Sequence, residues 1–523
     1  MSPLSMKREF SVSRLLPVMM SAVTLLLASA AQAAAPGITG TTFNLTAQPA
    51  FISQPDGNYI YSWGYGCNGA PGGFAPAMPN ATPSCSTMQI PGPTLIVTAG
   101  TTVTVNLTNN LPGAAGNTSI LFPGLQVAAS GGAVGLLTRE ATPGGGTVSY
   151  TLTIPSTAAG THSYYSGTQG DLQVEMGLYG AIIVLPSTIP AACTTGVHAS
   201  NLTAQNNWGE DNFRLAAAAY NHPGACYDRE YLFQFSEMDP RIHREAEEQA
   251  VRTCTGCMSV ATEPYVPAYF MINGRSMPDD MDPNYALEYP HQPYNGNPHM
   301  HPGELTLLRI VGQDRWQHPF HEHGNHVRVL ARDGNLILSA TDPATNLAGP
   351  PLFTTTTTPG QAMDGIFQWT GKGLNWDPYG HNAASGSTLP CSADANGYNT
   401  GAPTAINYFE WCQDHNKPLQ KSPFGDVASG GPVTLPDPNI FANGPWYGGS
   451  PYLGPDATVR AVGSTGTTPP SGTVANAPDS EAGFAFMWHS HNEREITTNN
   501  IFPGGMMMMM LVDSREFVID EAN

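Results

Sequence analysis

Short stretches in which apolar and polar residues alternate run through much of the chain, separated by clusters of Gly, Pro, Asn and Ser. In residues 102–107 every second residue is Val or Leu, and 148–154 repeats this period with Val, Tyr, Leu and Ile. Alternation of this kind is typical of β-strands with one buried face. The first part of the chain is therefore predicted to form strands at 95–97, 102–107, 148–154 and 181–185.

A second strand-rich part begins at residue 229. The predicted strands are 229–235, 269–272, 305–311, 326–330, 365–369, 484–491 and 506–512. The stretch 188–226 has little periodicity and is predicted to be a linker. Residues 241–252 carry mixed charges and predict a short helix on the surface.

The fold class is thus all-β, with one domain at 41–187 and a second at 227–523. Long insertions are expected at about 241–300 and at about 375–480, where Gly, Pro, Asn and Ser are frequent. Two domains are favoured because only one strand-rich start follows the linker. A three-domain arrangement stays open because the insertions are long.

Composition narrows the function. The chain has 523 residues with 56 Gly, 47 Pro and 11% charged residues, which argues against helical bundles, while 41% hydrophobic content argues against disorder. Acidic residues outnumber basic ones 40 to 20, giving a net charge of −20. Such a surface repels phosphate, so neither nucleic acid nor an anionic membrane is expected as a partner.

The N-terminus has the pattern of a signal peptide. Lys7, Arg8 and Arg14 precede an apolar stretch at 15–28, and Ala31-Gln32-Ala33 fits a cleavage site, so residues 1–33 are expected to be removed. General secretion and twin-arginine export both remain open. No later segment has the roughly 20 apolar residues of a membrane helix. The mature protein is predicted to be exported, to the periplasm or the extracellular space, with no membrane span.

Eight cysteines in an exported chain allow four disulfides. The predicted pairs are Cys67–Cys85, Cys193–Cys226, Cys254–Cys257 and Cys391–Cys412. For Cys254 and Cys257, which have only two residues between them, metal binding or redox chemistry is the alternative to loop closure.

Histidines carry the clearest chemical signal. Eleven of the fifteen lie after residue 290, and the densest group is His318-Pro-Phe-His321-Glu-His323. A second group is His489-Ser490-His491. Residues two apart in a strand share a face, so two adjacent His-x-His strands would present four imidazoles together. Imidazole suits Cu, Zn, Fe or Ni, so the four rings of His321, His323, His489 and His491 predict a metal site.

Several motifs resemble the multicopper oxidase superfamily: Pro91-Gly-Pro-Thr94, the run from Gly100 to Leu111, Met176-Gly-Leu-Tyr-Gly180 and the two histidine blocks. The resemblance covers most of 41–187 and 229–370 and resumes at 484–513. It implies cupredoxin-like β-sandwich domains of Greek-key type that bind copper, oxidise substrates and reduce oxygen. It also implies a homo-oligomer, a trimer, with metal between subunits.

Against that family, many ligand positions are replaced. Leu121 and Pro123 stand at the first His-x-His, and Tyr164-Tyr165-Ser166-Gly167 stands at the second. Ser490 replaces the cysteine of the blue type 1 copper, and Glu495 aligns with its later histidine. By resemblance His318 belongs to the type 1 site and the other four histidines to the trinuclear cluster. We therefore expect one or two copper ions rather than four.

Three further sets of side chains carry atoms that can bind metal. His299 and His301 are expected in a surface turn before Pro302-Gly303, where metal binding is the less favoured alternative. The methionines at 506–510 are predicted to pack in the core, with a thioether copper site as the alternative. Glu495 is expected to be a solvated charge.

The leading functional hypothesis is an exported copper-dependent oxidoreductase with a small-molecule or metal-ion reductant and oxygen as partners. A non-enzymatic protein that sequesters copper or docks a partner is the alternative, and a scaffold without metal is a third hypothesis. Neither a Gly-x-Ser-x-Gly elbow in a suitable context nor a phosphate-binding glycine loop favours hydrolase or nucleotide chemistry.

Overall fold

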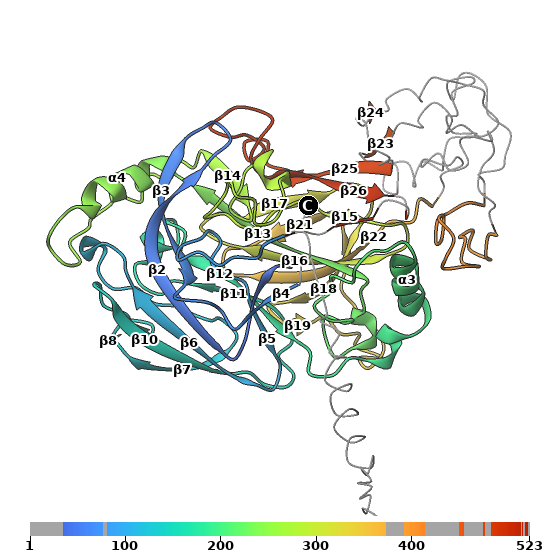
Figure 1. Ribbon diagram of the computed structural model, residues 1–523, viewed down its shortest axis with the longest axis horizontal. Helices are drawn as coiled ribbons and strands as arrows, with labels where there is room; N and C mark the ends of the chain where they lie inside the picture. The colour runs from blue at the N-terminus through green and yellow to red at the C-terminus, as the bar shows by residue number, and fades with distance from the viewer. Residues whose placement is uncertain are drawn as a thin grey trace, which may run out of the picture.

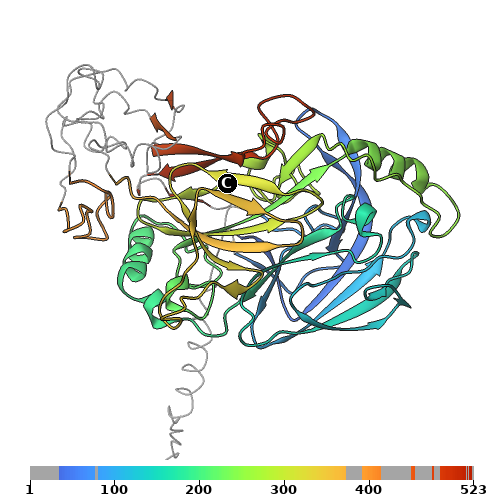
Figure 2. The same cartoon turned by 180° about the vertical axis from the view of Figure 1, so that it is seen from behind.

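The structure is a computed structural model that describes residues 35–76, 81–372, 392–413, 449–453, 474–475, 483–513, 515 and 518–520. Figures 1 and 2 show it from opposite sides. The predicted signal peptide at 1–33, and most of the predicted insertion at 375–480, lie outside the described residues. Among the described residues, no helix has the length and apolar character needed to span a bilayer.

The first part of the chain forms two sheets that face each other. One sheet has the order β11 (Gly160–Tyr165), β12 (Tyr179–Leu185), β5 (Leu95–Thr98), β1 (Gly37–Thr39) and β4 (Gly73–Ala75). The other has the order β3 (Tyr59–Cys67), β2 (Thr42–Ser53), β6 (Thr102–Asn109), β10 (Gly146–Thr153) and β7 (Gln126–Gly131). A small hairpin of β8 (Ala133–Val134) and β9 (Arg139–Glu140) lies beside them.

The alternation seen in the sequence builds the core between these sheets. Val103, Val105 and Leu107 on β6 are fully buried and alternate with more exposed Thr and Asn. They share one apolar cluster with Ile182 and Val184 from β12 of the facing sheet. The predicted strands of this part are all present: β6 and β10 alternate with the pleat, while β5 and β12 are continuous apolar runs.

The second part of the chain repeats the arrangement with larger sheets. One sheet has the order β14 (Tyr269–Ile272), β13 (Arg229–Met238), β16 (Leu305–Gly312), β22 (Ala362–Gln368), β18 (Val327–Arg332) and β19 (Asn335–Leu336), with β20 (Pro351–Leu352) paired to β18. The other has the order β15 (His299–Met300), β26 (Met507–Asp513), β25 (Gly483–Ser490), β17 (His318–Glu322) and β21 (Thr354–Thr357), extended by β23 (Gly449–Leu453) and β24 (Val474–Ala475). Strands β14 and β15 fall within 241–300, the stretch assigned to an insertion, and both belong to these sheets.

The two sandwiches pack against each other through their inner sheets. Ala181 and Ile183 on β12 turn away from the first core and join Leu232 on β13 and Val311 on β16 in a shared cluster. Central strands of these two sheets are therefore buried on both faces, as in β13, where every residue is buried. In Figure 1 the first sandwich lies at the lower left, and β25 and β26 lie at the upper right, below β23 and β24. Both sandwiches are cupredoxin-like.

Two helices differ from expectation. Helix α4 (Pro240–Ala250) is where the charge pattern predicts one, but Ile242 and Ala246 on it are fully buried in the first core, so one of its faces is not at the surface. Helix α3 (Gly196–Asn207) lies in the predicted linker. Its buried side chains are mostly polar, such as His198, whose Nδ1 lies 2.8 Å from Asp228. A helix with no apolar stripe leaves no periodicity in the sequence.

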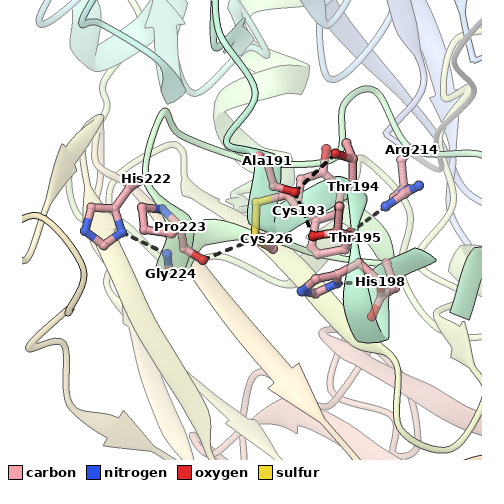
Figure 3. Close-up of a disulfide and its surroundings, with 12 residues drawn as sticks. Ala191, Cys193, Thr194, Thr195, His198, Arg214, His222, Pro223, Gly224 and Cys226 are labelled. Carbon is pink, nitrogen blue, oxygen red and sulfur yellow. Dashed lines mark hydrogen bonds and ion pairs between the residues drawn. A yellow bond between two sulfur atoms is a disulfide. The ribbon is translucent and has the colours of Figure 1, made fainter. Parts of the chain in front are cut away.

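Three of the four predicted disulfides are present: Cys67–Cys85, Cys193–Cys226 and Cys254–Cys257. Cys412 is also disulfide-bonded, and its predicted partner Cys391 lies outside the described residues. Figure 3 shows that Cys193–Cys226 ties the segment before α3 to the turn that precedes β13. The Cys254-Thr-Gly-Cys257 pair closes its own loop, as the favoured prediction had it.

Candidate metal centre

Two neighbouring strands carry the histidine blocks. Strand β17 pairs antiparallel with β25, which places His321 opposite His489 and Phe320 opposite Ser490. Directly opposite residues share a face of the sheet, so His321 and His489 lie on one face. His323 and His491 each follow one residue after the end of their strand. The structure thus brings together four of the five histidines predicted from the sequence.

The four rings form one cluster. The centroid of His321 lies 4.9 Å from that of His323, 4.8 Å from that of His491 and 5.6 Å from that of His489. The ring of His489 lies 5.2 Å from His323 and 5.6 Å from His491. The Nε2 atoms of His489 and His323 lie 3.3 Å apart. His321 and His489 are buried while His491 is exposed, so one side of the cluster is open to solvent.

Hydrogen bonds and burial prepare the rings for metal. Nδ1 of His489 donates to the carbonyl of Ser490 at 2.7 Å. In the neutral ring Nε2 therefore carries the lone pair, and this atom faces His323. Nδ1 of His321 lies 2.6 Å from Oγ1 of Thr354 on β21. Burial, with the neighbouring imidazoles, lowers the pKa of His321 to about 4, and burial lowers the pKa of His489 as well. Both rings are therefore neutral at pH 7, the form that binds metal.

His318 does not join this cluster. It lies an odd number of positions from His321 on β17, on the face that buries Phe320 in the core of the second sandwich. Its Nδ1 lies 2.9 Å from Oε2 of Glu495, and its Nε2 lies 3.0 Å from Oε2 of Glu237. Both ring nitrogens are thus engaged by carboxylates, which leaves none for the metal predicted at this residue.

This arrangement occupies the place that the resemblance assigns to type 1 copper. Burial opposes the charged form of His318, but the hydrogen bonds to Glu237 and Glu495 outweigh it and raise its pKa to about 9. Oγ of Ser490 donates to the same Glu495 oxygen at 2.5 Å. The expectation that Glu495 is a solvated charge is wrong, because its side chain is fully buried. An imidazolium held between two carboxylates stands where the family holds copper.

The replaced ligand positions of the first sandwich lie elsewhere. Leu121, Tyr165 and Gly167 line a cavity of about 370 Å³, whose wall includes none of the four clustered imidazoles. Pro123 lines an adjacent cavity with Leu121. Within the described chain, the first sandwich supplies no histidine to the cluster.

His301 belongs to a second group of donors, whose two glutamates the sequence did not indicate. His301 Nε2 lies 2.6 Å from Glu210 Oε2, and His301 N donates to Glu304 Oε2 at 2.9 Å. Glu210, His301 and Glu304 thus form a group whose possible ligand atoms all lie within 4.8 Å of one another. The expected surface turn is wrong, because His301 is 1% exposed.

Arginines neutralise this second group. The guanidinium of Arg229 contacts both Glu210 and Glu304, and that of Arg515 lies 4.0 Å from Glu304. Fixed cations among the carboxylates make a metal ion there unfavourable, so we interpret the group as a buried ion-pair network. The four imidazoles are spaced more loosely, and their donor set of neutral nitrogens makes them the stronger candidate for a metal site.

The two sandwiches and the imidazole cluster agree with the resemblance seen in the sequence. Residues 80–188 and 261–365 match two sequence models of the multicopper oxidase family. The chain belongs to the multicopper oxidase superfamily, and membership implies copper binding.

Several solved structures are similar at low identity. A blue copper oxidase from Nitrosomonas europaea is 14% identical, with 90% of this chain and 85% of that chain covered and a TM-score of 0.44. The multicopper oxidase mgLAC is 14% identical, with 90% and 86% covered and a TM-score of 0.42. A copper nitrite reductase from Nitrosomonas europaea is 18% identical, with 63% and 84% covered and a TM-score of 0.38. No curated protein matches this chain.

Proposed function

We propose that this protein is an exported, copper-binding oxidoreductase of reduced copper content. His321, His323, His489 and His491 hold one or two copper ions, and no blue type 1 copper is present. The observation that carries the proposal is the convergence of four imidazoles on one sheet face, with two Nε2 atoms 3.3 Å apart.

The spacing of that pair fits a shared ion. Two nitrogens about 2.05 Å from one tetrahedral ion are about 3.3 Å apart, by the bond lengths of imidazole–zinc sites. The 3.3 Å between His489 and His323 matches this ligand spacing, and the tautomer of His489 is the one that a metal at Nε2 requires. Four nitrogens are enough for one ion, or for two ions of low coordination number, but not for a cluster that needs eight histidines.

The protein's own groups have distinct roles. The carbonyl of Ser490 orients His489, and Thr354 orients His321, as outer partners of metal-binding histidines do. Bound copper would supply one-electron chemistry at this face. Since the type 1 position is filled by the Glu237–His318–Glu495 ion group, electrons would enter from a small-molecule or metal-ion reductant at the open side, beside exposed His491.

Two accompanying proposals concern assembly and location. We propose two domains, at 41–187 and 227–523, and a homo-oligomer of three copies in which the outward-facing cluster meets a neighbouring copy. The disulfides support an oxidising location, periplasmic or extracellular. Oxygen is the proposed electron acceptor.

A non-enzymatic copper carrier is the second candidate. The observation that favours it is the loss of the type 1 site, because Ser490 donates to Glu495 where an electron-transfer centre would need a thiolate. A protein that binds copper tightly without consuming oxygen in the presence of a phenol, Mn(II) or Cu(I) would be such a carrier.

The test is metal analysis with EPR on copper-reconstituted protein. We expect the His489→Ala/His491→Ala variant to lose most of the bound Cu(II) and its EPR signal. The matched control is His291→Ala/His326→Ala, which removes two half-buried histidines outside the cluster and should retain full copper. Equal copper in wild type and the first variant would refute the assignment of the site.

A further inference from the structure

The five consecutive methionines at 506–510 are divided between the two faces of the sheet that contains β25 and β26. Met506, Met508 and Met510 are fully buried in the core of the second sandwich, together with Phe486 and Trp488 of β25. These three account for the core packing predicted from the sequence. The remaining two, Met507 and Met509, lie on the opposite face because the side-chain period of a strand is two.

That opposite face is the one that carries the imidazole cluster. In the antiparallel pairing of β25 with β26, Met507 lies opposite His489, and Met509 lies opposite Met487. Met487 is two positions before His489 on the same strand, so it shares the face as well. One row across the sheet therefore reads Met507, His489 and His321.

The three outer methionines are close enough to act together. Directly opposite residues on antiparallel strands have Cβ atoms about 4.5–5.5 Å apart, and the long, flexible thioether adds reach. Met507 is 5% exposed, while Met487 and Met509 are half-buried. The trio lies under the protein surface, partly open, and next to a site with an exposed histidine.

The thioether groups of these methionines favour one oxidation state of copper. Thioether sulfur is a soft ligand that favours Cu(I) over Cu(II) or Zn(II). Thiols bind Cu(I) more strongly, but among the described residues no cysteine is free. The thioethers are therefore the soft donors that this part of the protein offers.

We infer that Met487, Met507 and Met509 form a Cu(I) site on the sheet face that carries His489. The inference rests on the proposed function for the identity of the metal, and it adds the oxidation state and a second set of ligands. The site lets the protein accept copper as Cu(I) beside the imidazoles, which as borderline nitrogen donors hold either state.

Core packing is the competing explanation, and the run itself provides the control. Met487→Leu/Met507→Leu/Met509→Leu removes the three outer sulfurs at nearly constant volume. Met508→Leu/Met510→Leu makes the same change on the core face. Met-to-Leu exchanges are well tolerated in packed sites, so both variants should fold.

The experiment is an anaerobic competition for Cu(I) against the chelator bathocuproine disulfonate, with X-ray absorption at the copper edge. We expect wild type to show sulfur scattering, and the outer-face variant to lose it along with at least a tenfold loss in Cu(I) affinity. The core-face variant should match wild type in both. Unchanged affinity in the outer-face variant, or Cu(I) surrounded by nitrogen alone in wild type, would overturn the inference.

A second arm separates this inference from the proposed function. In the His489→Ala/His491→Ala variant, Cu(I) bound by sulfur should persist while Cu(II) binding is lost. If the histidine variant keeps its Cu(II), the proposed function fails, and the sulfur scattering still decides the Cu(I) site. If the outer-face methionine variant keeps Cu(II) and also keeps Cu(I) at full affinity, the proposed function stands and the methionine site is refuted.

Discussion

The imidazole of His318 forms a hydrogen-bonded ion pair with the carboxylate of Glu495, in which Nδ1 lies 2.9 Å from Oε2. On its other side Nε2 lies 3.0 Å from Glu237, and all three side chains are fully buried. Ser490 completes the group through its hydroxyl. Positions that resemble a type 1 copper site thus hold a protonated imidazole between two carboxylates, and we expect this charged group to stabilise the fold.

Restoring the missing cysteine alone should not restore blue copper. In a Ser490→Cys variant the thiol meets Glu495 and a protonated His318 whose pKa is about 9, so no imidazole is available to share the metal. We expect no intense copper–thiolate band in the visible spectrum of the Cu(II)-loaded variant. The combination Glu237→Gln/Ser490→Cys/Glu495→His should develop one, because it supplies two imidazoles and a thiolate. A band in the single variant would show that copper readily displaces the carboxylates from His318.

The Glu237–His318–Glu495 ion group should also make the free energy of unfolding depend on pH. The folded pKa of His318, about 9, exceeds its ordinary value of 6.5, so its stabilising effect is complete below pH 6.5 and is lost as the pH rises through 9. The difference corresponds to roughly 3 kcal/mol for this buried group. We expect Glu495→Gln to lower the free energy of unfolding by about 1–3 kcal/mol at pH 6 and by much less at pH 10. Urea unfolding across this range measures it.

Glu493→Gln is the matched control for that experiment. Glu493 is exposed and lies two positions away, so its loss should change stability by less than about 0.5 kcal/mol at every pH. A Glu495→Gln cost that is equal at pH 6 and pH 10 would mean that the carboxylate stabilises the fold without a charged His318.

Most strands, and the meeting of the histidine blocks, could be predicted from local patterns. The Val–x–Val–x–Leu alternation of β6 and the His-x-His spacing both follow from the pleat, a property of single strands. The position of His318 could also have been placed by counting, since it is three residues before His321 and so faces the opposite side.

The parts that could not be predicted depend on contacts between distant residues. Glu495 looks solvated within its own polar segment, yet it is buried because His318, 177 positions earlier, provides a charge for it. Helix α3 packs through polar side chains, which leave no apolar stripe. The sequence shows that alternate methionines of the run face opposite sides. It does not show which of them share a face with His489, because that depends on the pairing register of β25 and β26.

The Glu210–His301–Glu304 network should support the fold and leave metal binding unaffected. Burial opposes ionisation of Glu304, but Arg229, His301 and Arg515 outweigh it and lower its pKa, so the carboxylate is charged in the folded state. We expect Glu304→Gln to destabilise the protein by about 3–5 kcal/mol, since it leaves a buried arginine poorly compensated. Copper content per folded chain should not change. Glu288→Gln, an exposed acid, is the control, and loss of copper without loss of stability would identify the network as a metal site instead.

The disulfides should contribute unequally to stability. Cys193 and Cys226 are 33 positions apart, and Cys254 and Cys257 only three. In the chain-entropy description, a closed loop of the first size stabilises the folded state by about 3.7 kcal/mol and one of the second size by about 1.6 kcal/mol. Cys193 and Cys226 are also buried, whereas Cys254 is exposed, so serine at the first pair places two hydroxyls in an apolar setting. We expect Cys193→Ser/Cys226→Ser to lower the urea midpoint clearly more than Cys254→Ser/Cys257→Ser does. An equal or reversed order would show that the loop closed by Cys254 and Cys257, which carries buried Met258 into the first core, contributes more to stability than its length implies.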